Sequence, residues 1–262
     1  MHYAPALLGV INLSPESMVR DSIVRDATER DERAAQLRQS GASLLDLGGR
    51  SITPDAAPID DGEEQRRLEP AVRALVEQGY RVSVDSWSSE TAVLALRWGA
   101  RFLNYTGEDL PDELLEETAG APGAQLALSY MPYGNAYQMR DTERAPYHID
   151  RIVDFFGPRV ERARRAGLDI AGGQLVLDPN LGILHPATDD YTKIQLQHHV
   201  LWNLEALRVL GCPVMLYAAR KPERLARIMM ASAVLHARPE YIRTHEPQIL
   251  QRLLQASRET SA

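Results

Sequence analysis

The chain contains a single cysteine, Cys212, among its 262 residues. One cysteine cannot form a disulfide within the chain, which suggests a reducing compartment such as the cytoplasm. Its place in the apolar stretch 211–216 favours a small buried hydrophobic residue over a reactive thiol. We therefore predict a cytoplasmic protein without structural disulfides.

Long apolar runs and an excess of basic residues are also missing. No segment reaches the roughly 18 consecutive apolar residues that a membrane-spanning helix needs. The first residues lack the charged region of a signal peptide. The formal charge is −7, whereas surfaces that bind nucleic acids are usually basic. We expect neither a membrane nor a nucleic-acid partner, and no Cys/His spacing indicates structural zinc.

What the sequence does contain is eight short apolar runs. Its composition, 44% hydrophobic and 25% charged, is that of an ordinary globular protein. Most of the runs are continuous, which is typical of strands buried on both faces in a parallel sheet. Amphipathic helical segments lie between them. The expected strands are residues 7–13, 43–47, 81–85, 101–104, 125–130, 174–178, 213–217 and 241–244.

A glycine recurs at the end of a helical pattern, a few residues before the next strand. Glycine adopts the left-handed conformation after a helix without a Cβ penalty. The five glycines are Gly41, Gly79, Gly99, Gly167 and Gly211. This strand–helix repeat predicts an α/β fold, a single (β/α)8 TIM barrel over residues 1–262. An open doubly wound sheet is the alternative, but no G-x-G-x-x-G motif is present. Pro70, inside a helical pattern, is expected to start or kink a helix.

Polar residues stand where the apolar runs end. Parallel strands of a barrel point their carboxyl ends at one face, so residues there converge on one pocket. Two carboxylates with an amide and an ammonium group suit a flat, nitrogen-rich heterocycle. The residues concerned are Asp85, Asp178, Asn104 and Lys221. Capping of the following helix is the alternative role for either aspartate. The irregular stretches 14–29 and 50–62 are candidate active-site loops.

Seven motifs at these strand ends resemble, in order, those of the dihydropteroate synthase family. They are residues 9–17 (GVINLSPES), 41–51 (GASLLDLGGRS), 83–86 (SVDS), 103–104 (LN), 177–179 (LDP), 220–221 (RK) and 243–245 (RTH). The resemblance covers nearly the whole chain. It implies a pterin-binding TIM barrel, in a superfamily that also includes folate-dependent methyltransferases.

The resemblance implies a division of roles among the site residues. Asp85, Asn104, Asp178 and Lys221 would hold the pterin ring, with Met131 against its face. No organic cofactor beyond the pterin substrate is implied.

The same resemblance places the pyrophosphate of the substrate near Arg243 and His245. Alternation along a strand puts these two positions on the same side, and arginine offers a fork of donors to phosphate oxygens. Arg50 would add a positive charge nearby, and Asn12 would bind the Mg²⁺ ion that accompanies the pyrophosphate. Lys221, Arg243 and His245 are the residues expected to take part in catalysis. A salt bridge to a neighbouring acid is the alternative role for Arg243.

The departures from the family pattern lie on the side of the second substrate. After the paired glycines the family usually reads Glu-Ser-Thr-Arg-Pro, whereas this chain reads Arg-Ser-Ile-Thr-Pro over residues 50–54. Thr53 thus replaces an arginine that helps to bind pyrophosphate. Glu16 and Met18 replace an aspartate and an aromatic residue in the first loop, Pro222 replaces a serine, and Leu184-His185 replaces a Gly-Lys pair.

Three functions are compatible with these residues. The first is a transferase that joins a dihydropterin, activated by a pyrophosphate on its methylene group, to an aryl amine such as p-aminobenzoate or a related acceptor. The second is a folate-dependent one-carbon transferase of secondary metabolism, and the third is a non-catalytic pterin-binding paralogue. The apolar stretch Ile228-Met229-Met230 is compatible with a homodimer, and core packing explains it equally well.

Overall fold

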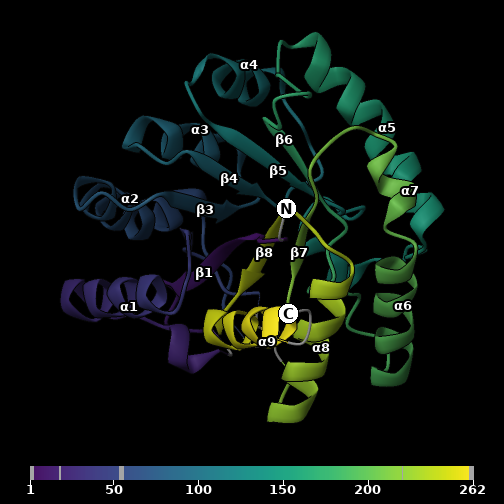
Figure 1. Ribbon diagram of the computed structural model, residues 1–262. Coiled ribbons are helices and arrows are strands. Elements are labelled where there is room, and N and C mark those ends of the chain that lie inside the picture. The colour runs from purple at the N-terminus through teal and green to yellow at the C-terminus, as the bar shows by residue number, and fades with distance from the viewer. Residues whose placement is uncertain (1–2, 18, 53–55, 220, 260–262) are drawn as a thin grey trace.

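The computed structural model describes residues 3–17, 19–52, 56–219 and 221–259. Its strands stand at the centre and its helices surround them (Figure 1). All strand pairs are parallel, in the order β6-β5-β4-β3-β2-β1-β8-β7. The strands are β1 (Ala6–Asn12), β2 (Leu44–Gly48), β3 (Val82–Ser86), β4 (Phe102–Tyr105), β5 (Gln125–Ser129), β6 (Leu175–Asp178), β7 (Met215–Tyr217) and β8 (Tyr241–Thr244).

The sheet curls round until its two edge strands meet. A parallel bridge joins Leu177 of β6 to Val214, just before β7. The backbone N–H of Leu177 donates to the carbonyl of Pro213 at 2.9 Å. This contact nearly closes the barrel, so the predicted TIM-barrel fold is confirmed and the open doubly wound sheet is wrong.

Helices follow the strands around the outside of the barrel. They are α1 (Ala27–Gln39), α2 (Asp61–Glu77), α3 (Ser89–Trp98), α4 (Asp112–Gly120), α5 (Ile149–Arg165), α6 (Asp190–Trp202), α7 (Glu205–Arg208), α8 (Arg224–His236) and α9 (Pro247–Glu259), with short 3-10 turns η1 (Arg20–Ser22) and η2 (Gln138–Asp141). None of the helices in the described part of the chain combines the length and apolar character that crossing a membrane requires.

Helix α2 shows how the sequence determines one of these units. Asp60 caps its N-terminus, because the carboxylate accepts a hydrogen bond from the backbone N–H of Glu63 at 2.7 Å. The helix runs through Pro70, so of the two expected outcomes the start of a helix is wrong, and a kink stays a prediction. Pro70 is exposed, and water can therefore satisfy the carbonyl that the proline leaves without its usual partner.

The five glycine stops are confirmed. Their φ angles range from +74° at Gly211 to +106° at Gly99, the left-handed region that glycine adopts without strain. At Gly99 a side chain would also collide with Val76 of helix α2, since a Cβ atom would lie 2.9 Å from it.

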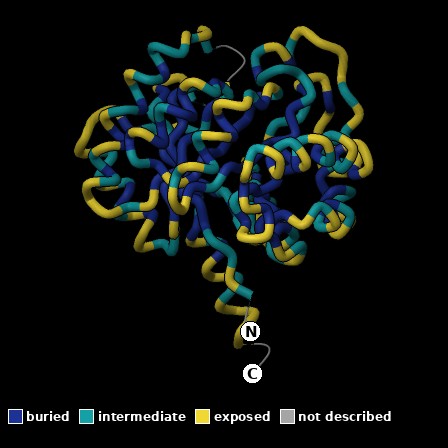
Figure 2. Tube along the Cα trace, turned by 90° about the horizontal axis from the view of Figure 1, so that it is seen from above, coloured by how far each residue is buried: buried dark blue, intermediate teal, exposed yellow. Residues whose placement is uncertain are grey.

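The barrel interior changes character along the strands. Its inner cluster is apolar and comprises Leu8, Leu44, Phe102, Ala127, Val176 and Met215. Two residues further along each strand the side chain faces the same way. Those positions carry mostly polar groups, among them Asp46, Asn104, Ser129, Asp178 and Tyr217. The buried interior is drawn in dark blue in Figure 2, with exposed segments around it. One end of the barrel is thus packed with apolar side chains, while the other presents hydrogen-bonding groups.

Candidate functional site

A cavity of about 360 Å³ lies at the carboxyl ends of the strands. Its wall includes every site residue expected from the sequence except Met131. Those lining residues are Asn12, Arg50, Asp85, Asn104, Asp178, Lys221, Arg243 and His245. They come from seven different strand ends or the loops after them, so barrel closure brings together residues that are far apart along the chain.

Arg243 forms two ion pairs inside the barrel. Its Nε donates to Oδ2 of Asp46 at 2.5 Å, and its Nη2 donates to Oδ2 of Asp85 at 2.7 Å. Burial by itself would lower the pKa of the guanidinium, but the two carboxylates raise that pKa above its ordinary value. The salt bridge considered as the alternative role for Arg243 is therefore present, and its contact with a phosphate stays a prediction.

Asp46 is the buried centre of this arrangement. It is completely inaccessible to solvent and also accepts hydrogen bonds from Oγ of Ser83 at 2.5 Å and Nδ2 of Asn104 at 3.3 Å. The sequence analysis gave this residue no role. A carboxylate that interrupts the apolar run Leu44-Leu45-Asp46-Leu47 was a usable signal, because a buried charge must find partners.

Two carboxylates face the cavity with raised pKa values. Burial raises the pKa of Asp85 to about 7, although Arg243 opposes the shift. Burial also raises the pKa of Asp178 to about 6, against the hydrogen bond from the backbone N–H of Asn180. Both groups are strong acceptors once ionised, and both would gain from donors on a ligand.

Asn104 and Asp178 keep hydrogen-bonding capacity toward the cavity. Oδ1 of Asn104 is buried and has no partner among the described residues. Oδ1 of Asp178 accepts from the N–H of Asn180 at 2.7 Å, whereas its Oδ2 has only a long contact of 3.4 Å with Oγ of Ser129. Unused acceptors of this kind suit the amino and ring N–H groups of a pterin.

Lys221 supplies the ammonium group at the rim of the cavity. Its Nζ donates to Oε1 of Gln197 at 3.2 Å, and Gln197 is held in turn by the carbonyl of Leu181 at 2.6 Å. Burial lowers the pKa of Lys221. An ammonium carries three donors, so Lys221 can hold Gln197 and still donate to a ligand.

Asn12 and His245 complete the part of the wall between β1 and β8. Nδ2 of Asn12 donates to Oγ of Ser17 at 3.0 Å and to Oγ of Ser22 at 2.6 Å. Oδ1 of Asn12 accepts no hydrogen bond within the described part of the chain. The His245 ring lies 6.0 Å from the ring of Tyr217 and nearly perpendicular to it. Among the described residues no group of three or more His, Cys, Asp or Glu side chains could hold a metal ion.

Comparison with known proteins identifies the family. The profile of a family described as pterin binding enzyme matches residues 8–240. The type-1 dihydropteroate synthase of Escherichia coli is 31% identical over 256 residues, which cover 92% of this chain and 88% of that protein. This chain belongs to the dihydropteroate synthase family. The type-2 enzyme of Escherichia coli is 28% identical and covers 95% of this chain and 94% of its own length.

Solved structures of family members have the same fold. Yersinia pestis dihydropteroate synthase in a sulfonamide complex superposes with a TM-score of 0.80 at 24% identity, over 97% of this chain and 94% of the other. Xanthomonas albilineans dihydropteroate synthase with 4-aminobenzoic acid gives a TM-score of 0.77 at 24% identity, over 98% and 93% of the two chains.

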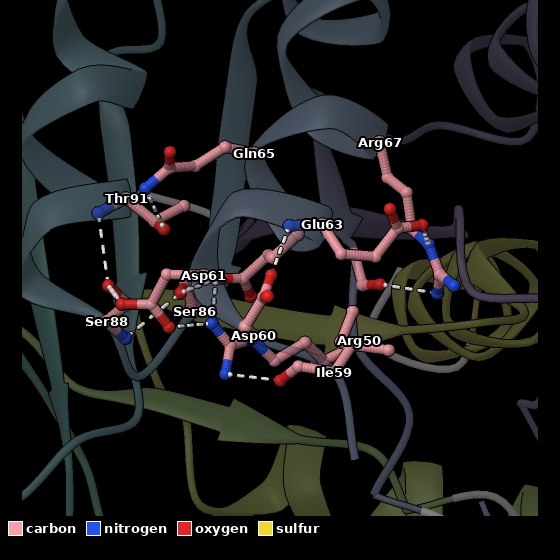
Figure 3. Close-up of polar contacts among 12 residues, drawn as sticks. Arg50, Ile59, Asp60, Asp61, Glu63, Gln65, Arg67, Ser86, Ser88 and Thr91 are labelled. Atoms are coloured by element: carbon pink, nitrogen blue, oxygen red, sulfur yellow. Dashed lines mark hydrogen bonds and ion pairs between the residues drawn. The ribbon is translucent and has the colours of Figure 1, made fainter. Parts of the chain in front are cut away.

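Arg50, the first residue of the departing segment 50–54, is paired inside the protein. Its Nη2 contacts Oδ1 of Asp61 and lies 3.0 Å from Oε2 of Glu64. Its Nη1 donates to the carbonyl of Ile59 at 3.4 Å. Figure 3 shows this cluster, with Ser88 bound to Asp61 and Ser86 beside it. The role of Arg50 in binding pyrophosphate was not tested and stays a prediction.

The first two loops of this family member are joined across the mouth of the barrel. Arg67 of helix α2 pairs with Glu16 at 3.2 Å and donates to the carbonyl of Gly49 at 3.2 Å. The carbonyl of Ile52 accepts from Arg140 at 2.8 Å, and the Ile52 residue is 40% exposed. Met18, residues 53–55 and Arg220 lie outside the described residues.

Met131 is the one expected pterin contact that does not line the cavity. It is completely buried, and its contact with the ring face stays a prediction.

Trp87 does line the cavity and packs edge-on against Tyr137, with 4.7 Å between ring centroids. Glu64, another buried wall residue, was missed by the sequence analysis. It occupies the same face of α2 as Leu68 and Ala71, where an acid among apolar residues was the available signal.

The raised carboxyl pKa values predict pH-dependent pterin binding. Ring N–H donors need ionised acceptors, so binding must displace the protons that Asp178 and Asp85 hold at low pH, with pKa values of about 6 and 7. Affinity is therefore expected to rise between about pH 5 and pH 8, by up to about tenfold per pH unit for each of the two carboxyl groups, and most steeply below about pH 6, where both hold a proton. Calorimetric titration of a pterin across this range measures the effect. A flat profile would contradict the assignment of these carboxylates as acceptors.

Proposed function

We propose that this family member is a dihydropteroate synthase-type transferase. It joins a dihydropterin that carries a pyrophosphate on its methylene group to an aryl amine, p-aminobenzoate or a related acceptor. The observation that carries the proposal is the convergence of Asp85, Asn104, Asp178 and Lys221 on one cavity. The reported complexes of relatives with 4-aminobenzoate and with 7,8-dihydropteroate support this choice of substrates.

In this proposal the pterin ring is held by acceptors on one side and a donor on the other. Asp85, Asp178 and Oδ1 of Asn104 accept hydrogen bonds from its N–H groups, while Lys221 donates to a ring acceptor. These side chains stand on strand ends supported by the apolar barrel interior. Such a rigid support orients the reacting methylene group toward the open mouth of the barrel.

The reaction needs the leaving group to be stabilised as its bond to the methylene carbon breaks. Departure of the pyrophosphate leaves a cation that the pterin stabilises, and the aryl amine then attacks that carbon. Arg243 is fixed by Asp46 and Asp85, yet its Nη1 donates to no described residue. We assign this donor and His245 to the pyrophosphate.

Mg²⁺ fits the remaining oxygen of this wall. Magnesium is commonly bound through one or two protein oxygens together with substrate phosphates and water. Oδ1 of Asn12 is a hard oxygen at the cavity, and its amide is oriented by Ser17 and Ser22. When bound, the ion would neutralise part of the pyrophosphate charge.

The test is turnover with defined substrates. The full chain is incubated with 6-hydroxymethyl-dihydropterin pyrophosphate, Mg²⁺ and a panel of aryl amines that includes p-aminobenzoate. We expect stoichiometric release of pyrophosphate and formation of the conjugate, and both to be lost in Asp85→Asn. Absence of any product across the panel would contradict the proposal.

A non-catalytic pterin-binding protein is the second candidate, and the pairing of Arg50 favours it. Arg50 is one of the cations expected to bind pyrophosphate, and its charge is already neutralised by Asp61 and Glu64. A cavity of this kind suits a protein that binds the pterin ring but does not catalyse its transfer. The same assay distinguishes the two, because this candidate binds pterin in calorimetry yet forms no conjugate. Tight binding of a reduced folate that is indifferent to Mg²⁺ would instead favour the folate-dependent one-carbon transferase.

A homodimer through helices α6 and α8 is part of the proposal. Large apolar residues are exposed on each of these two helices, which are neighbours in Figure 1. Tyr191 and Trp202 of α6 are 86% and 74% exposed, and Leu225 and Met229 of α8 are 68% and 64% exposed. Met230 is only 5% exposed and belongs to the core, so only part of the apolar stretch noted in the sequence is available to a partner.

A cytoplasmic location likewise stays a proposal, supported by the single cysteine.

A further inference from the structure

Arg50 is a buried cation whose charge is already balanced. Its side chain is 6% exposed although it lines the cavity. Asp61 and Glu64 both contact the same terminal nitrogen, Nη2, and its guanidinium carbon lies 4.8 Å from the centre of the Trp87 ring. The cation is therefore held between two acids and an aromatic face.

The two acids are themselves fixed from strand β3 and the turn after it. Oγ of Ser88 donates to Oδ2 of Asp61 at 2.6 Å, and Oγ of Ser86 donates to Oε2 of Glu64 at 2.8 Å. Asp61 is not the helix cap, since Asp60 performs that role for helix α2. The carboxylates at 61 and 64 are thus directed at Arg50. Figure 3 shows Asp61 and Ser88 on this side of Arg50.

Among the described residues of the cavity wall, the acidic side chains outnumber the basic ones. The carboxylates in or against the cavity wall are Asp46, Asp61, Glu64, Asp85 and Asp178. The cations of the described wall are Arg50, Lys193, Lys221 and Arg243. Arg243 pairs with two of these acids and Arg50 with two others. A pyrophosphate, which carries several negative charges, would have to compete with carboxylates for both guanidinium groups.

We propose that Asp61 and Glu64 determine leaving-group specificity in this protein. They act as built-in counter-anions of Arg50 and thereby weaken the binding of the pyrophosphate leaving group more than the binding of a single phosphate. The inference builds on the proposed function, because it concerns the side of the cavity that faces the leaving group.

The experiment measures the affinities of inorganic pyrophosphate and inorganic phosphate by calorimetry, with and without a saturating pterin. Asp61→Asn and Glu64→Gln are each expected to tighten pyrophosphate binding at least threefold, and the double variant about tenfold, because each releases donors of Arg50 for a charge-assisted hydrogen bond. Phosphate affinity should change less. Arg50→Gln added to Asp61→Asn should abolish the gain.

Glu69→Gln is the matched control. It removes the same charge from the same helix, but Glu69 lies on the surface, where its one ion pair with a described residue is with Arg73 at 2.8 Å. We expect its pyrophosphate affinity to stay within twofold of the parent chain. The inference is overturned if Asp61→Asn and Glu64→Gln bind pyrophosphate no more tightly than Glu69→Gln does. It is also overturned if the gain in pyrophosphate affinity persists when Arg50→Gln is added.

The design separates this inference from the proposed function. A parent chain that binds no pterin would contradict the proposed function, while the titrations without pterin would still decide the role of Arg50. Glu64 is completely buried, so its variant can lose stability. Asp61 has a side chain that is 45% exposed, and its variant tests the same contact in a chain expected to fold.

Discussion

Asp178→Asn is expected to weaken pterin binding about 100-fold, because two charge-assisted hydrogen bonds are lost or reversed. Asp178 is 5% exposed and already accepts one hydrogen bond, from the backbone N–H of Asn180. If the amide oxygen of an asparagine took over that bond, its NH₂ group would face the N–H donors of the ring. A donor opposed to donors cannot replace a carboxylate. Calorimetry with 6-hydroxymethylpterin measures the loss.

The size of the effect separates a ring contact from a merely structural role. Asp154→Asn is the matched control, since Asp154 lies on helix α5 with a side chain that is 72% exposed. It should bind the pterin as the parent chain does. Asp178→Asn should lose most of its pterin affinity while the midpoint temperature of its thermal unfolding changes little. An unchanged affinity would remove Asp178 from the pterin site and with it the strongest support for the proposed function.

Asp46→Ala is expected to lower the free energy of unfolding by about 3–5 kcal/mol, the usual result when one partner of a buried ion pair is removed. The carboxylate is inaccessible to solvent and holds Arg243, Ser83 and Asn104 together. Its removal leaves the Arg243 charge with Asp85 alone. Urea unfolding followed by circular dichroism measures the change.

Two further variants make this second prediction specific. Asp46→Ala combined with Arg243→Met removes the buried guanidinium together with Asp46. It should recover part of the lost stability, and only part, because Asp85 then loses its ion pair with Arg243. Glu69→Ala breaks an exposed pair on helix α2 and should cost less than about 1 kcal/mol. A loss in Asp46→Ala no larger than in Glu69→Ala would show that Asp46 does not hold Arg243 in solution.

Most of the fold was predictable because its strands and helix ends follow from short sequence patterns. Continuous apolar runs predicted the eight strands to within about two residues at their ends, and the five glycine stops all have the expected positive φ. One helical pattern was less informative. Apolar residues at 200, 201, 204 and 207 fall at helical spacing and predict a single helix, whereas α6 ends at Trp202 and α7 begins at Glu205. All four of these residues are buried, so periodicity by itself could not locate the break.

The sequence predicted most of the residues that line the candidate site, but it did not predict which of their side chains pair with one another. Strand-end positions indicated Asp85, Asn104, Asp178 and Lys221, and the family resemblance added Asn12, Arg50, Arg243 and His245. All eight line the cavity. The partners of Arg243 and Arg50 were not anticipated, because Asp46 and Glu64 sit within apolar patterns that were interpreted as core. The position of a residue within a periodic run predicts which face of the helix or strand it occupies. It does not predict which charged side chain of another element that face will meet.

The sequence by itself therefore determined the barrel and the set of polar groups at its mouth, since both follow from periods of two and 3.6 residues along the chain. Only the tertiary structure decided how those groups pair. Arg243 meets Asp46 across 197 residues of sequence, and Arg50 is neutralised by acids on the helix that follows it. Such pairings depend on distances of a few ångströms that closure of the barrel sets, and electrostatic energy changes steeply over those distances.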